Sequence, residues 1–355
     1  MSPFDPHPRD PAGAHRGSRP TVSFEVMPPR NPQAAPKFWA NASRLVDAHP
    51  DFVSVTYGAA GTDRDTARTV VDALLRRTPV LPIAHLTCVG HSRDAVADVV
   101  EEFLDSGVRS FLALRGDPPV GQPDWQPSPG GVNSSVELVA LMREVERRRC
   151  ESHPGTALRA AAHPMTIAVA TFPNGNPAAG TTPAQEIERL LVKQAAGADF
   201  AITQLFYEAE VYASFVERAR AAGIRIPILA GLLPATDPRR LRRVADLSGI
   251  EAPAALVAEL EAAPDDESRH AAGIAWTAQL AQAVLDAGAP GLHVYTFNQA
   301  RPALDLLEGV NLGGRTAPTE PALAPSVVGL APDLARGPRV TSTTDHVTTT
   351  KGQLP

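Results

Sequence analysis

Eight short apolar or β-branched segments, each followed by a longer segment of helical period, occupy the sequence between residues 20 and 314. Such alternation is typical of parallel α/β proteins, because two parallel neighbouring strands need a crossover connection, usually a helix. Eight repeats predict a closed (β/α)8 TIM barrel. The predicted strands are Thr21–Glu25, Phe52–Thr56, Leu81–Thr87, Ser110–Leu114, Thr166–Ala170, Phe200–Leu205, Ile226–Gly231 and Gly291–Thr296.

Two of the connecting segments show the helical period clearly. In Arg93–Ser106 and Ala184–Ala196 apolar residues recur three and four positions apart, and Gly107 or Gly197 follows as a stop. A doubly wound open sheet is the alternative architecture. Its dinucleotide site would lack the usual phosphate turn, because no Gly-x-Gly-x-x-Gly follows the first predicted strand.

The two ends of the 355-residue chain differ from its middle. Residues 1–19 are rich in Pro, Gly, Arg and His, and residues 315–355 are rich in Pro, Ala and Thr. Segments with so little to bury cannot offset the entropy lost on ordering. We therefore expect two disordered tails around one catalytic domain over residues 20–314. Two polar stretches inside that domain, Val120–Asn133 and Cys150–Pro164, are predicted to be extended loops.

Composition disfavours several classes of protein. A net charge of −6 argues against a nucleic-acid surface, which needs a basic face. No apolar run reaches the roughly 18 residues of a membrane span, and the first residues lack the apolar core of a signal peptide. Cys88 and Cys150 show neither disulfide nor zinc-site spacing. The sequence therefore indicates a cytoplasmic globular protein without a metal site.

Chemically active side chains stand where predicted strands end. The fourth strand leads into Arg115, Gly116 and Asp117 on a proline-stiffened loop, where an arginine suits phosphate and a carboxylate suits a cationic centre. Glu25 ends the first strand, and a general acid there needs a pocket in which burial raises its pKa. A surface Arg115–Asp117 pair and an exposed Glu25 are the alternative interpretations.

Further candidates are weaker when each is considered alone. His85 lies inside the third strand, where a satisfied core histidine is the commoner role. Gln204 ends the sixth strand with an amide that can both donate to and accept from the edge of a pterin-like ring. Glu186, Arg189 and Lys193 share one helix face, which is usually solvated.

Taken in order, these motifs resemble methylenetetrahydrofolate reductases of the bacterial, catalytic-domain-only type. The resemblance spans about Thr21 to Asn298. The matching motifs are Ser23-Phe24-Glu25 with Pro28-Pro29, Val55-Thr56-Tyr57-Gly58, His85-Leu86-Thr87-Cys88, Leu112 to Pro119, Ala198 to Phe206, and Tyr295-Thr296-Phe297-Asn298.

The resemblance implies an oxidoreductase on a (β/α)8 barrel that binds FAD at the carboxyl rim of the strands. Its reaction would reduce 5,10-methylenetetrahydrofolate to 5-methyltetrahydrofolate with NADH or NADPH, in one-carbon metabolism and methionine biosynthesis. It also implies a homo-oligomer. In this pattern Glu25 is the general acid that opens the folate's five-membered ring to an iminium cation, Asp117 stabilises that cation, and Gln204 binds the folate. The implied cofactor residues are Thr56, His85, Arg115, Gly116, Asp117 and Lys193, with Glu186 and Arg189 at positions where the family varies.

Four positions depart from the family pattern. Asn174 and Asn176 stand where the family often has ionisable groups, and Ser134 aligns with an expected flavin-contacting tyrosine. Gln299 replaces an arginine that can meet the folate's glutamate tail, which makes Gln299 and Arg301 the candidates for that contact. These changes leave open a second hypothesis, a folate reductase on the same barrel that binds flavin weakly or uses another hydride donor.

Two other classes of function fit the residues less well. The basic side chains at the rim suggest a lyase or aldolase acting on a phosphorylated substrate. Such an enzyme needs a Schiff-base lysine or a metal set at the strand ends, and neither is evident. A non-catalytic binding protein is disfavoured because Glu25, Asp117 and Gln204 are all present.

Overall fold

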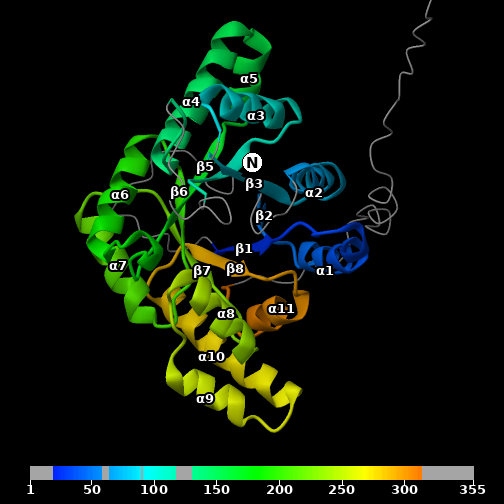
Figure 1. The fold of residues 1–355 in the computed structure, drawn as a ribbon, viewed down its shortest axis with the longest axis vertical. Coiled ribbons are helices and arrows are strands. Elements are labelled where there is room, and N and C mark those ends of the chain that lie inside the picture. The colour runs from blue at the N-terminus through cyan, green and yellow to red at the C-terminus, as the bar shows by residue number, and fades with distance from the viewer. Residues whose placement is uncertain (1–18, 58–63, 89–90, 117–129, 314–355) are drawn as a thin grey trace, which may run out of the picture.

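The computed structural model describes residues 19–57, 64–88, 91–116 and 130–313, which form a closed barrel of eight parallel strands (Figure 1). The strands neighbour one another in chain order, and β1 pairs with β8 to close the barrel. The predicted (β/α)8 fold is therefore confirmed. The strands are β1 (Thr21–Val26), β2 (Phe52–Val55), β3 (Leu81–Thr87), β4 (Ser110–Leu114), β5 (Thr166–Thr171), β6 (Phe200–Thr203), β7 (Ile228–Leu232) and β8 (Gly291–Tyr295).

Helices surround the barrel and follow its strands (Figure 1). The α-helices are α1 (Ala35–Asp47), α2 (Arg64–Arg77), α3 (Arg93–Asp105), α4 (Ser135–Ser152), α5 (Pro154–Ala162), α6 (Pro183–Ala195), α7 (Ala209–Ala221), α8 (Pro238–Ser248), α9 (Ala254–Ala262), α10 (Asp266–Asp286) and α11 (Ala300–Glu308). Short 3-10 helices are η1 (Pro32–Ala34) and η3 (Pro177–Ala179). The helices α3 and α6 confirm the two that the helical period predicted.

The loop predicted over Cys150–Pro164 is wrong. The helix α4 continues to Ser152, and α5 begins at Pro154 after a single residue, His153. Proline suits the first position of a helix, and the alanine-rich sequence that follows has high helix propensity. The two predicted tails, apart from Arg19, and most of the other predicted loop lie outside the described residues.

The strands are apolar on both faces, as expected of parallel strands covered by helices. Side chains such as Val22, Phe24 and Val26 of β1 belong to the layer between barrel and helices. A second cluster fills the inside of the barrel and consists of Phe52, Ile83, Leu112, Ala168, Phe200, Ile202 and Leu229. The barrel is thus a packed core.

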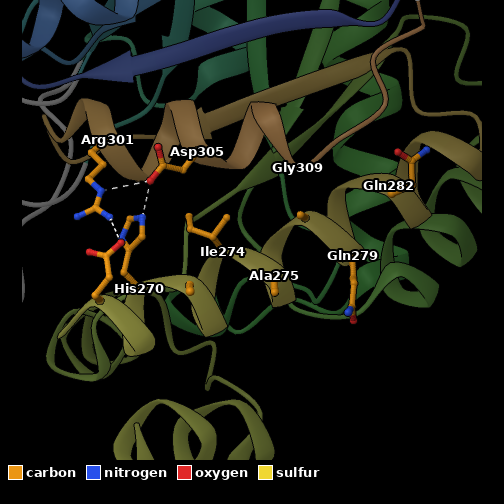
Figure 2. Close-up of a pocket in the computed structure, with 11 residues that line it drawn as sticks. His270, Ile274, Ala275, Gln279, Gln282, Arg301, Asp305 and Gly309 are labelled. Atoms are coloured by element: carbon orange, nitrogen blue, oxygen red, sulfur yellow. Dashed lines mark hydrogen bonds and ion pairs between the residues drawn. The ribbon is translucent and has the colours of Figure 1, made fainter. Parts of the chain in front are cut away.

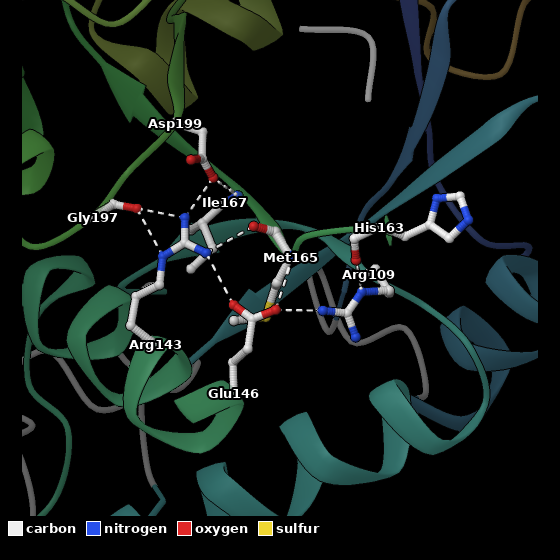
Figure 3. A network of polar contacts seen from close by, with 8 residues as sticks. All are labelled: Arg109, Arg143, Glu146, His163, Met165, Ile167, Gly197 and Asp199. Atoms are coloured by element: carbon white, nitrogen blue, oxygen red, sulfur yellow. Dashed lines mark hydrogen bonds and ion pairs between the residues drawn. The ribbon is translucent and has the colours of Figure 1, made fainter. Parts of the chain in front are cut away.

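A polar network ties α4 to the amino ends of β4, β5 and β6 (Figure 3). The Glu146 carboxylate accepts hydrogen bonds from the Arg109 guanidinium and from the Met165 backbone N–H at 3.0 Å. Arg143 donates to the Met165 carbonyl at 2.7 Å and to Asp199 at 2.6 Å. The network therefore fixes the N-terminal face of the barrel, opposite the carboxyl rim.

Replacing Glu146 by alanine is expected to lower the free energy of unfolding by about 2–3 kcal/mol, because Arg109 and the Met165 N–H lose a shared acceptor. Urea denaturation measures this change. The matched control is Glu151→Ala on the same helix, which removes only an exposed pair with Arg147 and should cost under about 0.5 kcal/mol. Equal effects of the two substitutions would contradict a stabilising role of Glu146 in this network.

Candidate active site

Glu25 lies at the carboxyl end of β1 with its side chain directed into the barrel. Its Oε2 atom is 3.6 Å from Nε2 of His85 on β3 and 3.8 Å from Nε2 of His293 on β8. The glutamate side chain is 20% exposed, whereas the two histidine side chains are 5% and 1% exposed. The carboxyl group is therefore enclosed by two imidazoles and retains access to the rim.

His293 is held in place by its other ring nitrogen and by its neighbours. Its Nδ1 atom is 2.8 Å from Ser23 Oγ, and the Ser23 hydroxyl donates to the Leu292 carbonyl at 3.1 Å. The ring also stacks on Phe52, with centroids 5.8 Å apart. These contacts fix the plane of the ring, so that its Nε2 atom faces the Glu25 carboxyl group.

The structure corrects the expectation that burial raises the pKa of Glu25. Burial does act in that direction, but the neighbouring imidazoles of His293 and His85 act against it, and the net pKa lies below the ordinary value. Burial lowers the pKa of His85 to about 4, with Glu25 acting in the opposite direction. His85 is therefore neutral near pH 7.

Sequence reasoning missed Ser23 and His293 as members of this site. The register of β1 on β8 pairs Ser23 with His293 and Glu25 with Tyr295. The signal present in the sequence was the alternation in β8, which places His293 and Tyr295 on the same face of that strand. Only the closure of the barrel brings that face to Glu25.

The candidate cofactor residues of β2 and β4 also lie at the carboxyl rim. Thr56 directly follows β2, and its buried Oγ1 atom has no hydrogen-bond partner among the described residues. Arg115 is exposed after β4, and Gly116 has a φ of 87°, which favours glycine. Asp117 lies outside the described residues, so its predicted position stays a prediction.

On the polar face of α6, Glu186 and Lys193 are buried, whereas Arg189 is exposed. Glu186 accepts a hydrogen bond from the Thr181 hydroxyl at 2.5 Å and pairs with Arg189 at 3.1 Å. Lys193 Nζ donates to the carbonyl of Ala170 on β5 at 2.8 Å. Burial lowers the pKa of Lys193 to about 8, with the charge of Glu186 opposing the shift. Such a buried cation is available to an anionic group of a cofactor.

Gln204 and Tyr295 lie on the other side of the rim. Gln204 is half-buried, and its Oε1 accepts the Leu205 backbone N–H at 2.9 Å. The Tyr295 hydroxyl donates to the Thr203 carbonyl at 2.7 Å. Both residues belong to the β6 and β8 strand ends, where apolar neighbours surround the amide. The Gln204 NH₂ group is thus free of a hydrogen bond to another described residue.

The turn after β8 is strained and held against β1. Phe297 and Asn298 have φ values of 47° and 59°, in the left-handed region that such residues rarely adopt. The Asn298 side chain accepts from the Met27 N–H at 2.8 Å and donates to its carbonyl at 2.7 Å. Arg240, in the first turn of α8, lies over the Phe297 ring at 5.7 Å. The rim near β8 thus presents a guanidinium stacked on an aromatic ring.

The two candidates for the folate tail occupy different positions. Gln299 is exposed immediately before α11. Arg301 pairs with Glu267 at 2.5 Å and with Asp305 at 3.3 Å, beside a cavity of about 570 Å³ between α10 and α11 (Figure 2). Asp305 also contacts His270 at 2.6 Å. These contacts hold Arg301 on the outside of the barrel.

The other three residues that depart from the family pattern cap helices or face outwards. The Ser134 hydroxyl caps α4 by accepting the Glu137 N–H at 3.2 Å. Asn176 caps η3 in the same way through Ala179 at 3.3 Å. Asn174 is exposed. No cluster of three metal-ligating side chains and no helix long and apolar enough to cross a membrane occurs among the described residues.

Comparisons with known proteins identify the relatives of this chain. The family model described as methylenetetrahydrofolate reductase matches residues 13–311. The 5,10-methylenetetrahydrofolate reductase of Escherichia coli is 31% identical over 282 residues, which are 79% of this chain and 86% of the relative. The probable methylenetetrahydrofolate reductase (NADH) of rice is 30% identical over 83% of this chain and 48% of its own length.

A solved structure from Clostridium thermocellum shares the fold. That uncharacterized protein, which binds two copies of 5-methyl-5,6,7,8-tetrahydrofolic acid, has a TM-score of 0.55 and 13% identity, covering 82% of this chain and 96% of its own. The likeness supports the barrel alone, whereas the extent and identity of the sequence matches define the family. The chain belongs to the methylenetetrahydrofolate reductase family.

Proposed function

We propose that this protein uses FAD and either NADH or NADPH to reduce 5,10-methylenetetrahydrofolate to 5-methyltetrahydrofolate. Family membership supports the folate reaction. The observation that carries the proposal is the Glu25 carboxyl group enclosed by His85 and His293 at the carboxyl rim. The proposal includes a cytoplasmic homo-oligomer that serves one-carbon metabolism and methionine biosynthesis.

The rim has groups that suit FAD. The buried Thr56 Oγ1 and His85 Nε2 have no hydrogen-bond partner among the described residues, and Lys193 and Arg115 offer positive charge for a pyrophosphate. The proposed flavin residues are Thr56, His85, Arg115, Gly116, Asp117, Glu186, Arg189 and Lys193. When bound, FAD supplies the group that accepts hydride from the nicotinamide and passes it to the folate.

Glu25 would act as the general acid on the folate. Its proton goes to the bridging nitrogen that leaves when the five-membered ring opens, and the iminium carbon formed there becomes the methyl group on reduction. Because the carboxyl pKa is lowered, Glu25 would have to take up a proton before each turnover, and the His293 imidazole, 3.8 Å away, would be the neighbour that hands it on. Ser23 keeps the imidazole in the required orientation.

The folate would extend from Glu25 across the β6 and β8 side of the rim. Gln204 would hydrogen-bond the pterin edge, and Asp117 would stabilise the cationic intermediate. Arg240 and Phe297 suit the remainder of the molecule, because a folate ends in an aromatic ring and a carboxylate-bearing glutamate. Phe297 lies two positions after Tyr295, the register partner of Glu25, and two residues of extended chain span about 7 Å.

Replacing Arg240 by alanine is expected to raise the KM for methylenetetrahydrofolate about tenfold or more and to leave the reduction of flavin by nicotinamide unchanged, since one charged contact to the tail is lost. Steady-state kinetics with the folate varied measure the effect. Arg242→Ala is the matched control on the same helix, because Arg242 is exposed and pairs with Glu261 at 2.9 Å. The same KM for both variants would remove Arg240 from the substrate site.

The affinity of the apoprotein for FAD is expected to fall about tenfold between about pH 7 and pH 9. Lys193 has a lowered pKa of about 8, so it is charged below that pH and loses its attraction for pyrophosphate above it. Fluorescence titration with FAD measures the change. Lys193→Arg is the control, because its guanidinium stays charged throughout and its FAD affinity should not vary with pH. A wild-type affinity that is equally constant would exclude Lys193 from the phosphate site.

A second candidate function is a reductase that binds flavin weakly or not at all. It is favoured by Ser134 and Asn176, whose side chains are engaged in helix capping instead of facing a cofactor. Yellow purified protein that releases FAD on denaturation supports the flavin enzyme. Colourless protein that still oxidises NADH in the presence of methylenetetrahydrofolate supports this second candidate.

The proposed function is tested by incubating the purified protein with methylenetetrahydrofolate, NADH or NADPH, and added FAD. We expect nicotinamide oxidation that depends on the folate, with 5-methyltetrahydrofolate as the product identified by chromatography. Nicotinamide oxidation without that product, or no turnover with either nicotinamide, would overturn the proposal.

A further inference from the structure

A cavity of about 450 Å³ opens on the N-terminal face of the barrel, opposite the proposed active site. It lies beside the amino ends of β3, β4 and β5 and is walled by α5. Arginines from three different elements line it, namely Arg109 before β4, Arg149 on α4 and Arg159 on α5. Asp105 is the one carboxylate residue among the lining residues. The lining is therefore rich in positive charge.

Two of these arginines are fixed by contacts that leave donors unused. Arg109 donates to Glu146 and to the His163 carbonyl, and Arg149 donates to Asp105 at 2.5 Å. A guanidinium carries five N–H donors in a rigid plane, so each anchored side chain can still bind an anion. Such anchoring orders the donors before a ligand arrives.

Arg159 has the clearest capacity for a ligand. Its guanidinium donates to the Thr156 hydroxyl of the same helix at 3.3 Å, and no carboxylate among the described residues forms an ion pair with it. Ser110 and Thr166, which are register partners at the amino ends of β4 and β5, add hydroxyl groups to the lining. Hydroxyl and guanidinium donors together suit the oxygens of a phosphate.

The remaining walls are apolar. Leu75, Leu81, Leu104 and Val108 line the cavity from α2, β3, α3 and the segment before β4. A fully hydrated inorganic ion would gain nothing from these walls, whereas a ring-sized organic body would bury its surface against them. The lining thus matches a molecule with one apolar part and one anionic part.

The helix α5 has no evident role in the packing of the core. None of its residues is buried, and Leu158 is 74% exposed. It nevertheless contributes Thr156 and Arg159 to the cavity, and His163 follows it. Figure 3 shows the His163 imidazole directed away from the network around Glu146. The helix α5 therefore forms a wall of this cavity and contributes no buried residue to the core.

We propose that this cavity binds a small organic phosphate, a phosphate monoester with a ring-sized apolar body, at a site separate from the folate and flavin. The phosphate contacts Arg159, Arg109 and Arg149, and the ring packs on the leucines of the opposite wall. The inference is independent of the proposed reaction, since it uses residues of the other face of the barrel.

The probe that tests it is 1-naphthyl phosphate, titrated calorimetrically into the full-length protein with excess FAD and NAD⁺ to occupy nucleotide sites. We expect one binding site per chain and an affinity at least tenfold weaker for 1-naphthol, which lacks the phosphate. Arg159→Ala should weaken binding of the phosphate by about tenfold to a hundredfold. Arg147→Ala, an exposed arginine of α4 outside the cavity, should leave it unchanged.

A second variant, Thr156→Trp, fills the cavity from α5 and should abolish binding. Both α5 variants should fold, because that helix contributes no buried residue. Absence of binding to the wild-type protein at millimolar probe would overturn the proposal. Equal affinities of the Arg159→Ala and Arg147→Ala variants would overturn it as well.

Discussion

Replacing Glu25 by glutamine is expected to slow methylenetetrahydrofolate reduction about a thousandfold while nicotinamide still reduces the flavin at the wild-type rate. Glutamine keeps the size of the side chain and its place between His85 and His293, but it has no acidic proton to give to the folate. The ring would then have to open without protonation of its leaving nitrogen.

Stopped-flow spectroscopy separates the two half-reactions of this variant. The nicotinamide half-reaction serves as the internal control, because a misfolded site would impair both halves. A thermal denaturation midpoint close to that of the wild type is expected, since the substitution retains the packing. Folate turnover near the wild-type rate would remove Glu25 from the role of acid.

Replacing His293 by asparagine is expected to slow the folate half-reaction about a hundredfold and to change its dependence on pH. In the wild type the imidazole of His293 lies 3.8 Å from the Glu25 carboxylate and lowers the pKa of that carboxyl group. The variant leaves Glu25 with His85 alone, a histidine whose pKa of about 4 keeps it neutral. The carboxyl pKa of the variant should then be higher, and the acidic limb of its pH profile should shift towards higher pH.

The control for that experiment is Ser54→Ala. Ser54 is buried on β2 as the register partner of Glu25, and its hydroxyl has no hydrogen-bond partner among the described residues. Its removal should leave the rate and the pH profile close to those of the wild type. If Ser54→Ala and His293→Asn changed the profile equally, His293 would have only a packing role.

The fold could be predicted from the sequence because each strand of the barrel is buried on both faces. Runs such as Phe111–Leu114 are therefore apolar and are followed within two residues by glycine, which marks them as strands. The segment Pro154–Ala162 was misassigned for the opposite reason. It buries no residue and begins with Pro154-Gly155, a pair that is also typical of a turn, so its helix propensity is outweighed by a loop signal.

The candidate active site could be predicted from the sequence only in part. Glu25, His85 and Gln204 lie near the carboxyl ends of strands and could be found from that position. The Ser23–His293 contact joins residues 270 positions apart and exists only because β8 closes on β1. The lowered pKa of Glu25 has the same origin, since it depends on the second imidazole. Lys193 shows a related limit of prediction from sequence. Helical spacing predicts the face of α6 on which Lys193 lies, but its burial follows only from the packing of that face on β5.

The central claim is tested most directly by an anaerobic titration of the purified protein followed by its visible spectrum. We predict a bound flavin spectrum that is bleached by NADH or NADPH and restored by stoichiometric 5,10-methylenetetrahydrofolate, with 5-methyltetrahydrofolate formed in equal amount. A flavin that is reduced by nicotinamide but is not reoxidised by the folate would contradict the account.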